Sequence, residues 1–409
     1  MDQFKTLTLQ NGLPVVAIET PGVKSYNFFL LVGTGFRFEE AGKMGITRFL
    51  ANSLFYGTQG MADQDMLYQK MDDLGISART EVSAEYTFYN FSVLPEVLDD
   101  SLALFGEVLT KPLLAEQNVL KEAQITTAEI NRRGLNVQQQ IFDKVNEMIF
   151  EGHPLGFFSM GKPDTVKAIT RQDLLDYYQK HYVSGNCLLV ASGPEFNFQE
   201  SLEKSFGQMA QGQRQQFTPF DFNKVSPRAE SINAPGKVGQ FVLSWLCYPR
   251  GAQERTAQAL LNAVLSYGRS NPYLGQLRKD KVVYSASSLI NLYSDCGVFS
   301  ILSSAENYRV KQAQDQILGI LEGLKTQAVS EEVLARAKNL YKSRLATLMQ
   351  SSLESSLFYA TRVFFNVDET SIDDVFNQID KVAPADIQKT AQTIFYPNGM
   401  FSVTAGSGF

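Results

Sequence analysis

Histidine and cysteine, the side chains that most often carry metal or nucleophilic chemistry, are scarce in this chain. A zinc ion held by histidines would have to use both His153 and His181, which lie far apart in the sequence, together with a carboxylate from elsewhere. The three cysteines form no CxxC pair, so the sequence indicates neither a structural zinc finger nor a disulfide framework. Because no G-x-S-x-G segment is present either, an independent active site built on these residues is the least favoured interpretation.

Polar side chains gather instead on two predicted helices. Arg48, Ala51 and Asn52 follow the i, i+3, i+4 spacing on a predicted helix at 43–56, so their side chains would point towards one spot. Glu122 and Glu129 are separated by one heptad in a later helical region, which places both carboxylates on one helical face. Taken alone, the two glutamates are most simply explained as part of a solvated helix surface.

The helix that carries Arg48 recurs in the second half of the chain. Residues 49–57 align with residues 260–268, and each segment is typical of a helix that ends in Tyr-Gly, with glycine as the C-terminal cap. Further matches follow in the same order at an offset of about 211 to 214 residues. The chain is therefore predicted to contain two copies of one structural unit.

This repeat defines the predicted domain organisation. An N-terminal unit at 1–212 carries the polar helix face, a connector without clear periodicity follows at 213–230, and the repeat unit occupies 231–409. Two domains also agree with the length, because 409 residues are too many for one ordinary hydrophobic core.

Each unit combines grouped strands with amphipathic helices. Residues 5–19 alternate across an Asn-Gly turn, which predicts a hairpin, and residues 76–94 are rich in β-forming side chains, as expected for two strands. Long helical regions are predicted at 115–150 and 331–363. This pattern predicts an α+β fold of two homologous units, each a mostly antiparallel sheet covered by helices.

The segment at 39–58 resembles the zinc helix of the pitrilysin/insulinase peptidases, the inverzincins, whose signature is H-x-x-E-H followed by x-L-F-x-G-T. The resemblance covers nearly the whole chain and implies the fold of the mitochondrial-processing-peptidase-like metallohydrolases. In that family both histidines bind zinc, the glutamate between them activates the metal-bound water, and a glutamate on a later helix is the third ligand.

This sequence differs from the family at all three defined positions of the H-x-x-E-H motif. Arg48 and Asn52 stand at the two histidine positions and Ala51 at the position of the general base, whereas Glu122 and Glu129 match the paired glutamates of the third-ligand helix. One carboxylate cannot hold a catalytic zinc, and a guanidinium is a permanent cation. We therefore expect a degenerate site without metal, filled by an ion pair between Arg48 and Glu129.

The second unit retains part of another family segment. The sequence at 271–288 resembles a segment whose arginine and tyrosine position the substrate and stabilise the transition state at the zinc site, and these residues correspond to Arg278 and Tyr284. A guanidinium can donate to peptide carbonyls and a tyrosine hydroxyl to a developing oxyanion. The alternative is that Arg278 belongs to a surface charge cluster and Tyr284 to a half-buried strand. The glycine of the family segment is missing.

The resemblance also implies a substrate strand. Ser77, Ala78 and Thr80 match the family's strand beside the cleft, where a peptide adds as an extra strand through main-chain hydrogen bonds. Ser77 replaces the usual asparagine.

Two functions follow from the resemblance. The leading one is a non-catalytic subunit of a heterodimeric zinc metallopeptidase, inactive as a single chain and without a cofactor of its own. A homologous zinc-binding subunit would hold the metal and cleave peptides, while this chain supplies Arg278, Tyr284 and half of the peptide chamber. The alternative is a peptidase-derived scaffold or peptide-binding protein with no catalytic role.

Composition and charge narrow the partners and the location. The formal charge is −6 and no basic footprint is visible, so nucleic acid is not expected as a partner. The longest apolar runs are too short to span a membrane, and no membrane partner is expected. Residues 1–5 lack the pattern of a secretory signal, so a cytoplasmic location is expected, with a periplasmic one as the alternative if a signal peptide has been removed.

Overall fold

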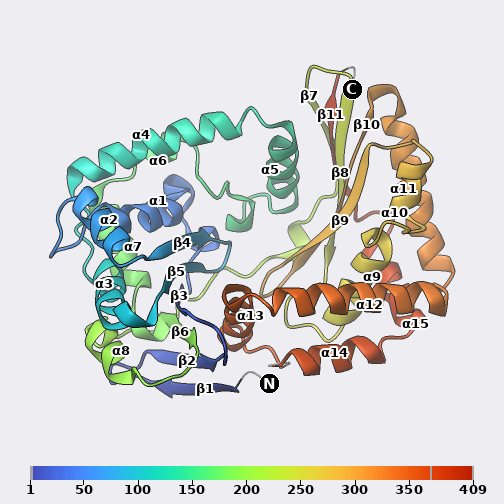
Figure 1. Ribbon diagram of the computed structural model, residues 1–409. Helices are drawn as coiled ribbons and strands as arrows, with labels where there is room; N and C mark the ends of the chain where they lie inside the picture. The colour runs from blue at the N-terminus through green and yellow to red at the C-terminus, as the bar shows by residue number, and fades with distance from the viewer. Residues whose placement is uncertain (1–2, 369–370, 408–409) are drawn as a thin grey trace. The chain divides into compact units, whose positions relative to one another are not determined.

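The computed structural model describes residues 3–368 and 371–407, which form two compact units (Figure 1). Neither unit is continuous in sequence. Unit 1 comprises the chain up to Arg132, Phe157–Thr218 and Met349–Asn366, and unit 2 comprises Arg133–Gly156, Pro219–Leu348 and the chain from Val367 onwards. The prediction of two units with continuous boundaries differs from this division, because a segment of each half packs with the sheet of the other half.

Unit 1 is built on a six-stranded sheet in the order β1-β2-β6-β3-β5-β4. All neighbouring strands are antiparallel except β2 and β6, which are parallel. The predicted hairpin is present as β1 and β2, with Gly12 in the left-handed region at φ 85° in the turn. The strands are β1 (Gln3–Thr8), β2 (Pro14–Glu19), β3 (Tyr26–Val32), β4 (Ser77–Val82), β5 (Thr87–Val93) and β6 (Cys187–Gly193).

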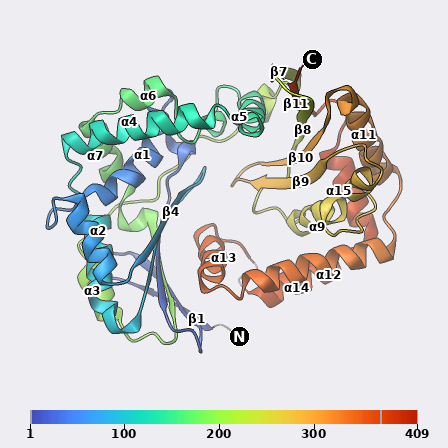
Figure 2. The same ribbon diagram turned by 45° about the horizontal axis from the view of Figure 1, so that its top comes forward.

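Helices cover both faces of this sheet. On β3, Phe28 and Leu30 pack in a large core with the helices of one face, whereas Phe29 and Leu31 pack against Tyr359 and its neighbours on α13. In the turned view of Figure 2, α13 lies on the side of the sheet opposite α2 and α3. Burial on both faces explains why β3 is continuously apolar. The helices of unit 1 are α1 (Ile46–Ser53), α2 (Gln64–Asp73), α3 (Leu98–Thr110), α4 (Glu116–Arg133), α6 (Pro163–Lys167), α7 (Arg171–His181), α8 (Gln199–Phe206) and α13 (Ser352–Phe364).

Unit 2 repeats this plan with a five-stranded sheet in the order β7-β11-β8-β10-β9. Within this sheet, β7 and β11 are the only parallel pair of described strands. On one face Trp245 and Phe299 pack edge-on against Phe395, and on the other face α5 contacts β8 and β11. The elements are α5 (Val137–Ile149), β7 (Ala229–Asn233), β8 (Val238–Cys247), α9 (Arg255–Ser266), α10 (Leu274–Lys279), β9 (Ser285–Leu292), β10 (Gly297–Glu306), α11 (Val310–Thr326), α12 (Glu331–Leu348), α14 (Ile372–Lys381), α15 (Pro384–Ile394) and β11 (Phe401–Gly406).

Both predicted long helical regions are interrupted. The helix after each break, α5 or α13, belongs to the unit built on the sheet of the other half. In the first half, α4 ends at Arg133 and α5 begins after Asn136, whose side chain caps it by accepting from Gln139 N at 3.1 Å. In the second half, Ser351 caps α13 in the same way. The prediction of a long helical region at 115–150 is met by two helices, whereas the prediction of one long helix at 331–363 was wrong; each break frees the second helix to pack on the sheet of the other half.

Candidate functional site

Helix α1, which carries three of the predicted site residues, is fixed in place by a buried carboxylate. Glu39 is almost fully buried, and its two oxygens accept from the backbone N–H groups of Gly45 at 2.7 Å and Thr47 at 3.0 Å, at the first turn of the helix. Burial raises the pKa of Glu39 to about 7, although these hydrogen bonds favour the charged form. The start of α1 therefore has a defined position in the core of unit 1.

The three motif positions on α1 have different surroundings. Ala51 is fully buried in the core between the helix and the sheet, so its methyl group is a packing residue. Asn52 is half-buried and faces α4, and the side chain of Arg48 is 39% exposed. The structure therefore brings Arg48 and Asn52 to α4, whereas the expected convergence of all three side chains is not found.

Glu122 on α4 is the centre of a closed hydrogen-bonded group. Its buried carboxylate accepts from Asn52 Nδ2 at 2.8 Å and from Thr126 Oγ1 at 2.7 Å on one oxygen, and from the Tyr56 hydroxyl at 2.6 Å on the other. Burial, and then the contact with Glu122, raises the pKa of Tyr56, so its hydroxyl remains a donor. The interpretation of Glu122 as part of a solvated surface is therefore wrong.

Glu129 faces Arg48, as the sequence predicted. The guanidinium Nη2 lies 3.8 Å from Glu129 Oε2, which makes an ion pair but is too long for a hydrogen bond. The two side chains are similarly exposed, at 39% and 37%. Arg48 Nε is buried and has no hydrogen-bond partner.

These side chains do not fit the zinc ion of the related peptidases. A guanidinium offers only donors, and both oxygens of Glu122 already accept hydrogen bonds from three side chains. Among the residues that the structure describes, no group of three histidine, cysteine, aspartate or glutamate side chains could hold a metal ion. No chemical step is therefore assigned to a metal ion bound by these side chains.

The two histidines are both buried, and they lie in different units. His181 is buried beside the ring of Tyr177, with ring centroids 4.3 Å apart, and burial lowers its pKa to about 3. His153 is buried in the other unit, where Nδ1 accepts from Leu155 N at 3.2 Å. His153 is thus held by packing and a local hydrogen bond, whereas both ring nitrogens of His181 are buried without a hydrogen-bond partner.

Arg278 and Tyr284 lie in unit 2, at the end of α10 and just before β9. Tyr284 is 59% exposed, so it is not the half-buried strand residue of the alternative interpretation. Its hydroxyl donates to Glu306 Oε1 at 3.1 Å, and this contact raises its pKa. Arg278 is also exposed. Between them Lys281 adopts a left-handed conformation at φ 57°, in the segment that lacks the family glycine.

The predicted substrate strand is β4, the last strand of the unit 1 sheet. It pairs only with β5 in the described part of the chain, so one of its edges is open. Ser77 and Ala78 are exposed and Thr80 is half-buried. Arg79 lies between them and pairs with Glu81 at 2.8 Å.

Tyr56 and Thr126 are site residues that the sequence analysis missed. Tyr56 follows Asn52 by four residues and Thr126 follows Glu122 by four, so helical spacing was the available signal.

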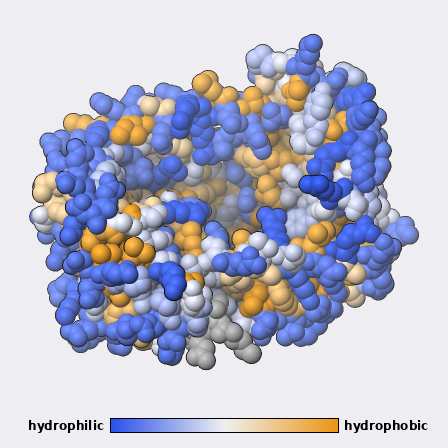
Figure 3. Space-filling view, viewed as in Figure 1, coloured by the Kyte–Doolittle hydropathy of each residue, from blue (hydrophilic) through white to orange (hydrophobic). Residues whose placement is uncertain are grey.

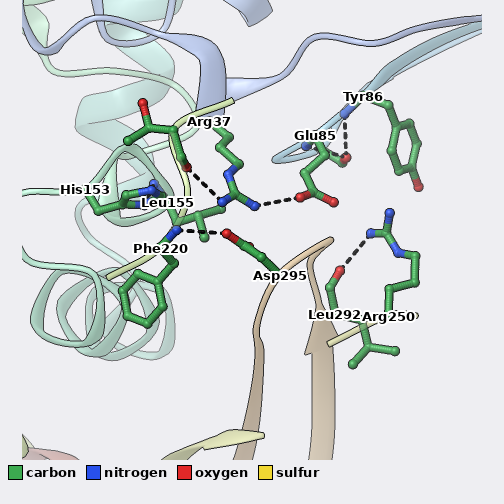
Figure 4. Close-up of polar contacts among 11 residues, drawn as sticks. Arg37, Glu85, Tyr86, His153, Leu155, Phe220, Arg250, Leu292 and Asp295 are labelled. Atoms are coloured by element: carbon green, nitrogen blue, oxygen red, sulfur yellow. Dashed lines mark hydrogen bonds and ion pairs between the residues drawn. The ribbon is translucent and has the colours of Figure 1, made fainter. Parts of the chain in front are cut away.

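The connector was also expected to be irregular, but its residues are held at two points. In unit 1, Arg37 forms a buried ion pair with Glu85 at 2.7 Å and donates to Thr218 O at 2.9 Å; in unit 2, Phe220 N donates to Asp295 at 2.8 Å (Figure 4).

On the face drawn in Figure 3, unit 1 is largely hydrophilic and is interrupted by small hydrophobic groups. The exposed apolar side chains of unit 1 include Met66 on α2 and Leu120 on α4. No helix in the described ranges combines the length and apolar character needed to cross a membrane.

Comparison with known proteins gives matches along most of the chain. Residues 14–162 match the family described as "Insulinase (Peptidase family M16)", and residues 168–341 match "Peptidase M16 inactive domain". A Rickettsia felis protein named "Uncharacterized zinc protease" is 27% identical over 348 residues, which cover 84% of this chain and 83% of that protein.

Two solved structures share the fold over nearly the whole chain. A peptidase M16 inactive domain from Pseudomonas fluorescens has a TM-score of 0.91 at 17% identity, covering 100% of this chain and 99% of that one. A chain of complex III2 from Candida albicans has a TM-score of 0.82 at 18% identity, with 98% and 95% covered. These likenesses confirm the predicted α+β fold of two homologous units.

Proposed function

The chain belongs to the insulinase family of peptidases, family M16, and from this premise we propose that it is a non-catalytic subunit of a two-chain peptidase. The observation that carries the proposal is the hydrogen-bonded group around Glu122. Asn52, which stands at the position of a histidine in the resembling motif, donates to the buried Glu122, and Tyr56 and Thr126 donate to the same carboxylate, so these side chains are committed to one another within the chain.

The proposed partner is a homologous chain with an intact H-x-x-E-H motif, which would bind zinc and cleave the peptide bond. This chain would supply Arg278 and Tyr284 to the partner's site and form half of the peptide chamber. The exposed Tyr284 hydroxyl, which donates to Glu306 in the free chain, can donate to a developing oxyanion instead. The exposed Arg278 can donate to peptide carbonyls. The substrates are peptides or unfolded segments.

Peptide hydrolysis by the reconstituted pair tests this role. We expect Tyr284→Phe to lower kcat by about 100-fold with little change in KM, because the lost donor acts on the transition state. Tyr308→Phe is the matched control, since Tyr308 is also an exposed tyrosine of the same unit, at 74% against 59% for Tyr284. Equal turnover by the wild-type, Tyr284→Phe and Arg278→Ala pairs would reject the catalytic-support role.

A scaffold without catalytic function is the second candidate. It is favoured by the likeness of fold to a chain in the structure of complex III2 from Candida albicans. In that case the only role of the Tyr284 hydroxyl is its hydrogen bond to Glu306. Substitution of Arg278 or Tyr284 would then leave the activity of every co-purifying peptidase unchanged.

A further inference from the structure

The sheet of unit 2 ends on a strand whose outer edge is unpaired. β7 is parallel to β11 and pairs with no other strand in the described part of the chain. In unit 1 the corresponding strand is β2, which is parallel to β6 and is covered on its outer side by β1. The internal repeat is therefore incomplete at this position, because no described strand of unit 2 takes the place of β1.

Two backbone hydrogen bonds define which groups of β7 face away from β11. Ser402 N donates to Arg228 O at 3.1 Å, and Ala234 N donates to Gly406 O at 3.0 Å. The N–H and C=O groups of one residue point to the same side of a strand, and the side alternates along the chain. The even-numbered residues of β7 therefore bond to β11. The outward-pointing backbone groups belong to Ala229, Ser231 and Asn233.

The side chains along this edge are compatible with a neighbouring strand. The three residues with outward-pointing backbone groups have exposed, uncharged side chains, so the charges that commonly protect an edge strand are absent from their face. On the opposite face Glu230 is neutralised within unit 2 by Lys144 at 2.9 Å and by Arg228 at 3.1 Å. Helix α5 packs over β8 and β11, the inner strands, rather than along the edge.

We infer that β7 pairs antiparallel with β7 of a second copy of this chain. When Ser231 of one copy lies opposite Ser231 of the other, Ala229 of each copy lies opposite Asn233 of the other copy. These are the residues whose backbone groups point outwards, so every opposed pair can exchange both of its backbone hydrogen bonds. On the other face Glu230 lies opposite Ile232, so like charges do not meet.

A second copy is the occupant that the strand itself specifies. A two-fold axis at Ser231 matches each outward donor of one copy with an acceptor of the other, as a symmetric interface requires. The sheets of the two copies then continue into one another across the axis. The inference goes beyond the proposed function, because it concerns two copies of this chain and needs neither a peptidase partner nor hydrolysis.

Sedimentation velocity of the full chain alone measures this association. One pair of short strands buries less than the about 1,000 Å² of a stable interface, so we expect a reversible dimer with a dissociation constant of about 10–100 µM. The sedimentation coefficient should rise with protein concentration through this range. A chain that remains monomeric at about 1 mM would overturn the inference.

Charged substitutions at the proposed axis identify the strand. Ser231→Lys and Ser231→Glu each place two like charges opposite each other, so each variant alone should associate about tenfold more weakly than the wild type. An equimolar mixture of the two variants should recover the association, because a lysine then faces a glutamate. This recovery also shows that both variants are folded. Ser343→Lys is the matched control, since Ser343 is an exposed serine on α12 of the same unit, and it should associate like the wild type.

A backbone substitution separates strand pairing from a contact between side chains. Ser231→Pro removes an outward N–H and leaves the hydrogen bonds to β11 in place, so it should also weaken the association. The inference is overturned if any of the three substitutions at Ser231 leaves the association unchanged. It is equally overturned if the mixture of charged variants associates no better than each variant alone.

Discussion

Removal of the Tyr56 hydroxyl tests whether the carboxylate of Glu122 depends on its three donors. In the folded protein this hydroxyl donates at 2.6 Å to the oxygen that Asn52 and Thr126 do not contact. Tyr56→Phe keeps the ring in place and leaves that oxygen buried without its donor. Hydrogen bonds to charged groups are worth about 1.5–3 kcal/mol, so we expect the free energy of unfolding of unit 1 to fall by about 2 kcal/mol.

Urea unfolding followed by far-UV circular dichroism measures this change. The single tryptophan, Trp245, lies in unit 2, so tryptophan fluorescence would report on the wrong unit. Hydrogen exchange of peptides from α1 and α4 then localises the effect. The control is Tyr68→Phe, which removes a hydroxyl that is bonded to Gln64 at the surface. A loss below about 0.5 kcal/mol, or a loss equal to that of the control, would refute the reasoning.

Three further outcomes are expected. Ala51→Glu, which restores the general base of the family motif, should destabilise the chain by about 3 kcal/mol in urea unfolding, because Ala51 is fully buried in the core. Burial raises the pKa of Glu39 from 4.5 to about 7, so between these pH values the folded protein keeps a proton that the unfolded chain releases. The free energy of unfolding should therefore fall as the pH rises from 4.5 to about 7. Glu39→Gln should remove this part of the pH dependence. Lys281→Gly should raise the midpoint of thermal unfolding, with a gain of about 0.5–1 kcal/mol, because glycine adopts φ 57° without strain.

The three side chains that stand at the motif positions fit their surroundings to different degrees. Ala51 packs in the core and Asn52 donates to the buried Glu122, so two of the three substitutions are satisfied locally. Arg48 is the exception, since its Nε remains without a partner and its ion pair is long.

Several features could be read from the sequence because they depend on local spacing. The hairpin at 5–19 follows from alternation around a turn. The approach of Arg48 to Glu129 was predicted instead from the resemblance to family positions on two distant helices. The enclosure of Glu122 could not be predicted with the same certainty. Tyr56 and Thr126 are at helical spacing, but spacing alone does not tell which face of a helix meets its neighbour.

The sequence by itself determined that the chain contains two copies of one α+β unit and that Arg48, Ala51 and Asn52 stand in the segment that resembles the H-x-x-E-H motif, because repeats and side-chain identities are written along the chain. Only the tertiary structure decided that α5 packs in unit 2 and α13 in unit 1. The apolar face of an amphipathic helix requires a sheet to cover, but it does not specify which sheet. In the same way, only the distances between α1 and α4 decided which carboxylate is enclosed and which guanidinium is left with unused donors.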